Sequence, residues 1–199
     1  MGAGVGGYTA ALRAASLGLR VALIERSLIG GTCLNVGCIP TKALLESAKL
    51  VRLASHSSDF GVTLEPRQIS LGKAVERSRK VVEVLRKGVE DLLRARGVQI
   101  VRGNAKLLGE GRVEIDVDGA QRCLEGANII VATGSSWINI PGAEPDSTNV
   151  ITSDEALYLE EIPASMVIIG AGAVGCEFAE IYSAFGLSLI HISEPTRPY

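Results

Sequence analysis

The residues Gly2-Ala3-Gly4-Val5-Gly6-Gly7 open the chain with a G-x-G-x-x-G pattern. The alanine-rich residues 8–17 predict a helix closed by Gly18, and the apolar residues 19–24 predict a strand that ends in Glu25. Such glycines let a backbone approach a pyrophosphate at a helix N-terminus, and the acid binds a ribose hydroxyl. The glycine pattern alone is also common in ordinary tight turns. The helix, strand and acid at the right spacing therefore carry the prediction of a dinucleotide site.

The same glycine spacing returns towards the other end of the chain. A strand is predicted at residues 166–169 and a helix at residues 176–185, on either side of the second glycine run. The spacing of Gly2, Gly4, Gly7 and Gly18 is repeated by Gly170, Gly172, Gly175 and Gly186. Two such sites predict an α/β protein with two Rossmann-like domains and two nucleotide cofactors. Only Met1 precedes the first run, so we expect an N-terminal truncation that removes the first domain's central strand.

Two cysteines lie in a predicted glycine-rich loop at residues 30–42, GGTCLNVGCIPTK, which runs into a predicted helix at residues 41–54. Pro40 suits the first turn of that helix, where an N–H has no partner within the helix. Cys38 should then lie at or just before a helix N-terminus, where backbone N–H groups and the dipole favour a thiolate. With Cys33 five residues earlier, the pair suits dithiol–disulfide exchange. Two inert thiols remain an alternative, whereas a zinc site lacks a second pair of ligands, so no metal site is predicted.

Residues 30–45 resemble the active-site segment of the class I pyridine nucleotide–disulfide oxidoreductases, and are most similar to that of the dihydrolipoamide dehydrogenases. The resemblance covers residues 1–186. It implies a Rossmann-like FAD-binding domain over residues 1–145, without its first strand, and the start of a Rossmann-like NAD-binding domain over residues 146–186. The Pro/Gly-rich residues 141–149 form the predicted boundary. We expect FAD at the first glycine run and NAD at the second, with NADP not excluded.

The resemblance also implies roles for single residues. Cys33 would exchange with the dithiol substrate, Cys38 would face the flavin, and Lys42 and Glu177 would form a buried ion pair beside the flavin's reactive nitrogen and between the two domains. The predicted catalytic residues are Cys33, Cys38, Lys42 and Glu177. The residues predicted to bind the flavin nucleotide are Gly2, Gly4, Gly7, Glu25, Gly31, Thr32, Cys33, Lys42, Ala105, Thr133, Gly134 and Ser135. Those predicted to bind the nicotinamide nucleotide are Gly170, Gly172, Ala173, Val174, Gly175 and Glu177.

The middle of the chain carries weaker signals. Residues 68–96 predict a long amphipathic helix that packs on the first helix, and residues 98–101 predict a strand. Residues 113–117 and 122–124 predict a hairpin around Asp118-Gly119. A buried strand is predicted at residues 128–131, running into the turn that contains Thr133.

The end of the chain departs from the resemblance. The residue in register with Glu25 is Ser193, and prolines follow. We therefore expect residues 187–199 to be a non-native tail, and we leave them out of the predicted fold. The family's acid–base histidine belongs to a C-terminal dimerisation domain, and neither His56 nor His191 has its context, so the chain alone is expected to be inactive. His56 is expected to be solvated at a helix end.

Composition excludes several classes. The 199 residues carry 20 basic and 22 acidic side chains, well mixed, with no basic stripe for nucleic acid. The apolar runs are too short to span a bilayer. Four cysteines without a signal peptide suit a reducing compartment, so a cytoplasmic location is expected.

The resemblance implies that a parent enzyme oxidises dihydrolipoamide, free or protein-bound, with NAD⁺ through a Cys33–Cys38 disulfide. It also implies a homodimer that serves a 2-oxo acid dehydrogenase complex. Three alternatives remain open. One is an NADPH-dependent enzyme like glutathione or mercuric reductase, although Ala173 stands where some glutathione reductases carry a gating tyrosine. The others are a flavin-binding module without activity and a truncated polypeptide with no function.

Overall fold

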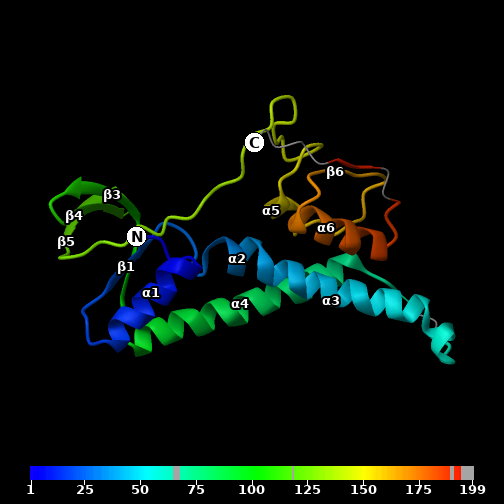
Figure 1. Cartoon of the computed structure of the whole chain (residues 1–199), viewed down its shortest axis with the longest axis horizontal. Coiled ribbons are helices and arrows are strands. Elements are labelled where there is room, and N and C mark those ends of the chain that lie inside the picture. The colour runs from blue at the N-terminus through cyan, green and yellow to red at the C-terminus, as the bar shows by residue number, and fades with distance from the viewer. Residues whose placement is uncertain (65–67, 118, 189–190, 194–199) are drawn as a thin grey trace. The chain divides into compact units, whose positions relative to one another are not determined.

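The structure, a computed structural model, describes residues 1–64, 68–117, 119–188 and 191–193 (Figure 1). The chain forms two compact units. The first contains residues 1–35 and 82–137, and the second contains residues 36–81 and 138–199. The chain leaves the first unit at Trp137, whose side chain is 53% exposed.

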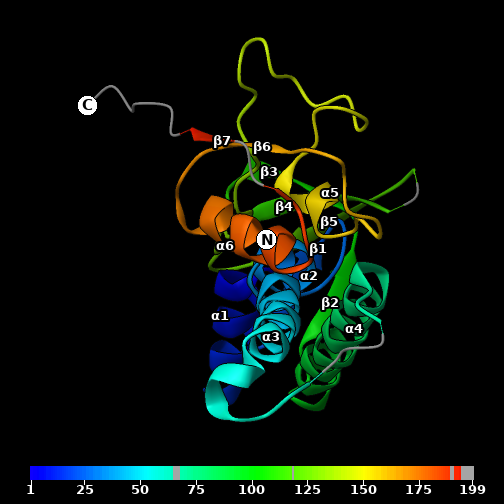
Figure 2. The same cartoon turned by 90° about the vertical axis from the view of Figure 1, so that its right-hand side faces the viewer.

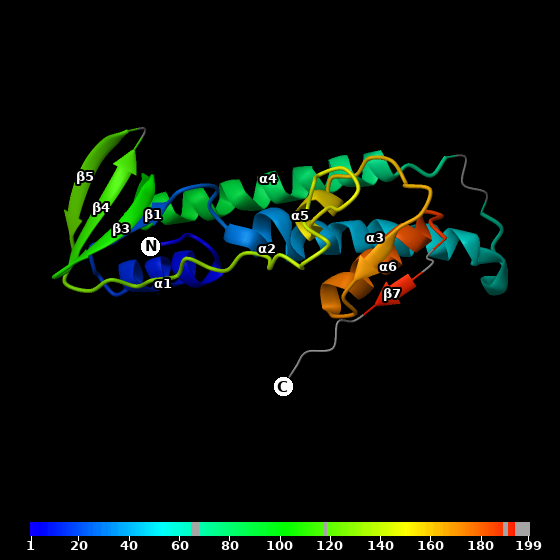
Figure 3. The ribbon, with the colours of Figure 1, turned by 90° about the horizontal axis from the view of Figure 1, so that it is seen from above.

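The first unit combines a parallel strand pair with helices and an antiparallel meander. Strand β1 pairs in parallel with β2, so that Ala22 lies opposite Gln99. Strands β3, β4 and β5 form the meander, which Figure 3 shows from above. The elements are α1 (Val5–Ser16), β1 (Ala22–Glu25), α2 (Gly31–Val36), the second half of α4 (Leu71–Ala95), β2 (Gln99–Arg102), β3 (Asn104–Gly109), β4 (Arg112–Val117) and β5 (Ala120–Glu125).

Strand β1 is buried on both faces, as its apolar sequence predicted. Successive side chains of a strand point to opposite faces. Leu23 accordingly packs with Ala11 of α1 and Leu93 of α4, whereas Ile24 packs with Ile115 of the meander. The predicted packing of the long helix on the first helix is therefore confirmed.

The second unit is built around two packed helices, α3 and α6 (Figure 2). Leu44 of α3 and Ile181 of α6 are almost fully buried in one apolar cluster, together with Val75 of α4. The hydroxyl of Tyr182 donates a hydrogen bond to the Ala156 carbonyl at 2.6 Å. The elements are α3 (Cys38–Ser55), a 3₁₀ turn (Ser57–Phe60), the first half of α4, α5 (Ser153–Ala156), β6 (Val167–Ile169), α6 (Ala173–Ala184) and β7 (His191–Ser193).

The buried strand predicted at residues 128–131 is wrong. This segment is extended but not part of a strand, and Ile130 and Val131 are 58% and 57% exposed. Its backbone partner is Met1, whose N-terminal amine donates to the Ile130 carbonyl and whose own carbonyl accepts from Ala132 N–H, both at 2.8 Å. Because Met1 is a single residue, it cannot form a strand beside residues 128–131 or cover both faces of this segment. The apolar side chains of the segment therefore stay exposed.

The residues after α6, which were left out of the predicted fold, join the second unit where the structure describes them. Leu187 is buried in the cluster of the second unit. Strand β7 pairs in parallel with β6, with His191 opposite Val167. The chain after α6 thus returns beside the strand that precedes it, as in a β–α–β unit. Residues 189–190 and 194–199 lie outside the described part, and the non-native origin of the tail stays a prediction.

The compact units do not follow the boundary predicted at residue 145. The apolar faces of α3 and α6 share one cluster, so α3 falls in the same unit as the second glycine run. The assignment of cofactor-binding domains stays a prediction. Among the described residues, no helix has the length and apolar character needed to cross a membrane.

Candidate functional site

The first glycine loop is shaped by backbone packing. Gly2 has φ +88°, and a Cβ on Gly7 would lie 1.8 Å from the Gly2 carbonyl oxygen. Both positions therefore require glycine for the loop itself. Gly4 precedes α1 as its N-cap, and no side chain caps the helix. The first N–H groups of α1 consequently have no partner within the helix and remain available to an anion.

Two predicted flavin-binding segments adjoin this loop. A Cβ on Gly31 would lie 2.5 Å from the Gly4 Cα. A Cβ on Gly2 would lie 2.1 Å from the Ala132 carbonyl oxygen and 3.0 Å from the Thr133 Cα. The structure thus brings Gly2, Gly4, Gly31 and Thr133 together, although they come from three parts of the sequence.

Glu25 lies beside the same loop at the end of β1. Its carboxylate accepts hydrogen bonds from the N–H groups of Ala3 at 2.7 Å and Ser27 at 2.8 Å. Its carbonyl accepts from Gly103 N–H at 3.0 Å, which connects it to the segment that carries Ala105. The side chain that was predicted to bind a ribose is therefore held in place by backbone donors.

The two cysteines of the redox segment lie on different helices. Cys38 is the first residue of α3 and is exposed, which confirms its predicted place at a helix N-terminus. Cys33 is half-buried in α2, a helix where the sequence predicted a glycine-rich loop. Cys33 belongs to the first compact unit and Cys38 to the second, and their disulfide stays a prediction.

Asn35 is a positioning residue that the sequence analysis missed. Its buried side-chain amide donates to the carbonyl oxygens of Ile29 at 3.0 Å and Gly31 at 2.9 Å. It also accepts from Arg86 at 3.4 Å. Asn35 thereby fixes the backbone that meets Gly4. A polar residue between the apolar Leu34 and Val36 was the available signal.

Lys42 and Glu177 form an ion pair between Lys42 Nζ and Glu177 Oε1, as predicted. The pair is not buried, because the Lys42 side chain is 60% exposed and that of Glu177 is 25% exposed. Nor does it bridge the two compact units, since both residues belong to the second. Further along the same helices Arg52 makes a bidentate ion pair with Glu180. The distances are 2.5 Å from Nε to Oε1 and 2.9 Å from Nη2 to Oε2. Two ion pairs therefore link α3 and α6, one near their N-terminal ends and one further along both helices.

The second glycine loop repeats the geometry of the first. Gly170 has φ +117°, and a Cβ on Gly175 would lie 1.9 Å from the Gly170 carbonyl oxygen. Gly172 is the N-cap of α6, again without a capping side chain. Ala173 and Val174 form the first turn, and both are exposed. This loop can therefore present N–H groups to a second anionic ligand.

The histidines and metal-binding side chains add little. His56 caps α3 and is exposed, with Nδ1 3.0 Å from the Arg52 carbonyl oxygen, as expected for a solvated helix end. No cluster of three or more His, Cys, Asp or Glu side chains suits a metal ion in the part of the chain that the structure describes.

The sequence pattern of the family described as "Pyridine nucleotide-disulphide oxidoreductase" matches residues 1–198. The chain belongs to this family. Members of the pyridine nucleotide-disulphide oxidoreductase family are typically dependent on FAD and NAD(P). The match spans both glycine loops and the cysteine segment.

Individual relatives agree with this assignment. The chain is 49% identical to a dihydrolipoyl dehydrogenase of Chlorobaculum parvum over 187 residues, which cover 94% of this chain and 40% of the relative. It is 39% identical to a dihydrolipoyl dehydrogenase of Bacillus subtilis over 199 residues, 99% of this chain and 43% of the relative. The chain thus spans about 40% of the length of these curated relatives.

Solved structures show the same fold. LpdA of Mycobacterium tuberculosis superposes with a TM-score of 0.89 at 26% identity, covering 98% of this chain and 43% of that one. The HOCl-induced flavoprotein disulfide reductase RclA of Escherichia coli gives a TM-score of 0.78 at 30% identity, covering 94% of this chain and 40% of that one.

Proposed function

We propose that this chain is part of a dihydrolipoyl dehydrogenase, which passes two electrons from dihydrolipoamide through the Cys33–Cys38 disulfide to NAD⁺. The observation that carries this proposal is the Lys42–Glu177 ion pair. It joins α3, the helix that begins at Cys38, to α6, the helix that begins after the second glycine loop, one turn in from the first residue of each helix. Redox thiol and nucleotide loop are thereby linked through two charged side chains.

The residues present fit two nucleotides. In each loop a glycine N-cap leaves the helix N-terminus open, which suits a pyrophosphate. Glu25 accepts one backbone N–H at each oxygen, and each carboxylate oxygen keeps a lone pair that can accept a ribose hydroxyl. We assign FAD to the first loop, with Gly31–Cys33, Lys42, Ala105 and Thr133–Ser135 as further contacts, and NAD to the second.

The sulfur chemistry is thiol–disulfide exchange. A substrate thiolate attacks Cys33 Sγ, the Cys33–Cys38 bond breaks, and Cys38 leaves as a thiolate that the α3 N-terminus stabilises. The second substrate thiolate then attacks the substrate sulfur bound to Cys33, which releases oxidised lipoamide and the Cys33 thiolate. Two electrons reach the cysteine pair, and two protons leave the substrate. Bound FAD supplies the route by which this electron pair passes to NAD⁺.

Lys42 supplies a positive charge next to the exposed Cys38 turn. Its ammonium would stabilise the negative charge that a bound flavin would gain on accepting electrons, and Glu177 orients it. The lipoyl-bearing substrate, a 2-oxo acid dehydrogenase complex as partner, a homodimer and a cytoplasmic location are proposed from the relatives.

Replacing either redox cysteine in the full-length protein tests the reaction. We expect Cys33→Ser and Cys38→Ser to lower turnover of dihydrolipoamide and NAD⁺ on the order of 10³-fold or more, because exchange needs both sulfurs. Cys123→Ser, a change at an exposed thiol of β5, should leave turnover unchanged. Thiol titration should find two more thiols after reduction than before. A protein whose Cys33 and Cys38 both titrate before reduction has no such disulfide, and the proposal fails.

Removing the Lys42 charge tests the ion pair. We expect Lys42→Met to slow flavin reduction by dihydrolipoamide about 10–100-fold while the flavin stays bound, and Glu177→Gln to slow it less. Stopped-flow absorbance of the flavin measures this rate. Lys49→Met, at an exposed lysine of the same helix, is the matched control. A normal rate in Lys42→Met would show that the pair has no role in electron transfer.

A further inference from the structure

Strand β2 has an open edge. Its Gln99 N–H donates to the Val21 carbonyl at 2.9 Å, and Gly103 N–H donates to the Glu25 carbonyl at 3.0 Å. Along a strand the backbone groups turn alternately to either side. Ile100 and Arg102 therefore turn their N–H and C=O groups away from β1. No other strand pairs with β2 among residues 1–64, 68–117, 119–188 and 191–193.

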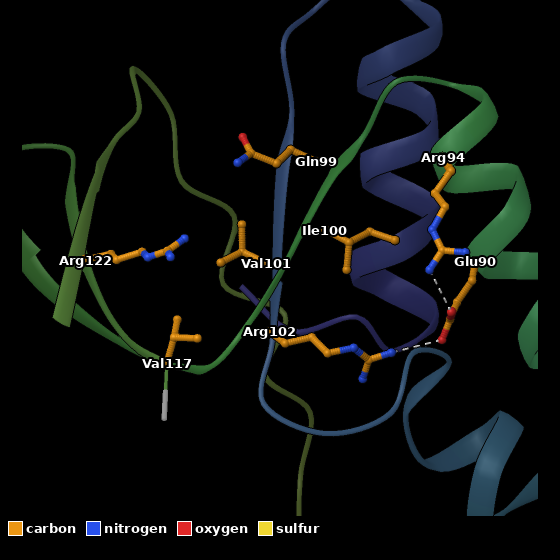
Figure 4. A pocket seen from close by; sticks show the side chains of 8 residues that line it. All are labelled: Glu90, Arg94, Gln99, Ile100, Val101, Arg102, Val117 and Arg122. Carbon is orange, nitrogen blue, oxygen red and sulfur yellow. Dashed lines mark hydrogen bonds and ion pairs between the residues drawn. The ribbon is translucent and has the colours of Figure 1, made fainter. Parts of the chain in front are cut away.

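A hollow of about 440 Å³ follows this edge. All four residues of β2 line it, together with Glu90 and Arg94 of α4 and Val117 and Arg122 of the meander (Figure 4). Every lining residue belongs to the first compact unit. Ile100, Val101 and Val117 supply apolar surface. The hollow thus combines unpaired backbone groups with an apolar floor.

The hollow has an excess of positive charge, with three arginines and one glutamate. Glu90 is 17% exposed and pairs with Arg94 at 3.3 Å and Arg102 at 3.1 Å. The Arg122 side chain makes no ion pair or hydrogen bond with the described residues. Figure 4 shows Arg122 with Gln99 and Val101 on one side of β2, and Arg102 with Arg94 on the other.

We propose that the open edge of β2 binds an extended acidic segment of a partner protein as an added strand. The backbone groups of Ile100 and Arg102 would form the ladder, and the cations on both sides of β2 would meet the alternating side chains of the segment. A compact anion reaches the cations on one side only, so the arrangement favours a strand. This site lies apart from the glycine loops and requires neither flavin nor disulfide.

Binding of a synthetic peptide tests this surface. The probe is a short acetylated peptide rich in Glu and Val, added to the protein as its gene encodes it. We expect measurable binding by calorimetry that weakens as salt is raised, and no binding of the matching Lys and Val peptide. Arg122→Glu should weaken binding about tenfold or more. Lys106→Glu makes the same charge change on β3, outside the hollow, and should leave binding within twofold.

Amide hydrogen exchange provides the geometric readout. We expect the peptide to slow exchange at Ile100 and Arg102, whose N–H groups face the open edge, and not at Gln99, which already pairs with β1. Absence of peptide binding would overturn the proposal. So would displacement of the peptide by pyrophosphate without edge protection, because that marks a compact anion site. A third outcome would also overturn it: the unaltered protein binds no peptide, and the Arg122→Val variant self-associates. The arginines would then serve only to prevent this edge from pairing with another copy of the chain.

Discussion

The two glycine loops share one backbone design but differ in what surrounds them. Their N-caps are nearly superposable in dihedral angles, with φ −70° and ψ −175° at Gly4 and φ −72° and ψ −177° at Gly172. In both, the third glycine packs against the carbonyl of the first. The first loop is further enclosed by Gly31 and Ala132, whereas a Cβ on Gly170 or Gly172 would meet nothing within 4 Å.

This difference separates two reasons for a glycine. Gly7 and Gly175 are required by the loop itself, since their neighbours are backbone atoms of the same turn. Gly31 is required because it packs against Gly4, and Gly2, which already needs glycine for its positive φ, is also required because Ala132 packs on it. At Gly4 and Gly172 the protein alone leaves room, with only a 3.7 Å contact at Gly4, so a requirement for glycine there would come from a ligand.

The largest effect is expected from Gly7→Ala and Gly175→Ala. Each places a Cβ less than 2 Å from a carbonyl oxygen, so the loop must open, and we expect each to cost about 3–5 kcal/mol of unfolding free energy. Urea unfolding measures the change. Gly6→Ala, in the same helix as Gly7, is the control, because its Cβ would make only an ordinary 3.9 Å contact with the Ala132 Cβ. If Gly175→Ala were tolerated and Gly7→Ala were not, the two loops would not share a design.

A smaller effect is expected from Glu25→Ala, which acts on the first loop only. It leaves the N–H groups of Ala3 and Ser27 without their carboxylate acceptor, at a cost of about 1–3 kcal/mol. Flavin retention through gel filtration should also fall. Glu25→Gln keeps one acceptor oxygen, so its stability and flavin retention should lie between those of the unaltered protein and those of Glu25→Ala. Unchanged flavin retention in Glu25→Ala would remove the ribose assignment.

The smallest effect on stability is expected from Gly4→Ala and Gly172→Ala. Alanine is a poorer N-cap than glycine, which costs about 0.5–1 kcal/mol, but no clash follows. Nucleotide affinity should nevertheless fall at least tenfold, for flavin with Gly4→Ala and for NAD⁺ with Gly172→Ala, because a Cβ there holds the pyrophosphate off the helix. Titration calorimetry measures the flavin affinity of Gly4→Ala and the NAD⁺ affinity of Gly172→Ala. Unchanged affinities would show that the ligands bind elsewhere.

Features with local signals were predictable from the sequence. The glycine loops, α1, α3, α4 and the β4–β5 hairpin each carry their own caps, turns or periodicity. The Lys42–Glu177 pair followed from the resemblance, because residues 135 positions apart leave no local trace. Its exposure did not follow, since burial depends on every neighbour.

The errors arose where distant partners decide the outcome. Residues 128–131 are apolar enough for a buried strand, but their backbone meets only Met1. Strand β7 is short and followed by prolines, yet β6 offers it a ladder. The glycines around residues 31–36 predict a loop, because glycine destabilises helices. The structure has helix α2 there, and the Asn35 side chain stabilises it by donating a hydrogen bond to the Gly31 carbonyl.

The position of Trp137 determines how unfolding of this protein can be followed. It is the chain's single tryptophan, and it lies where the chain leaves the first unit rather than in any of the three apolar clusters of the described residues. Because the indole is already 53% exposed, its emission wavelength should shift little when the protein denatures. Fluorescence would then give only a small signal for unfolding, whereas far-ultraviolet circular dichroism, which reports the helices directly, would give a large one.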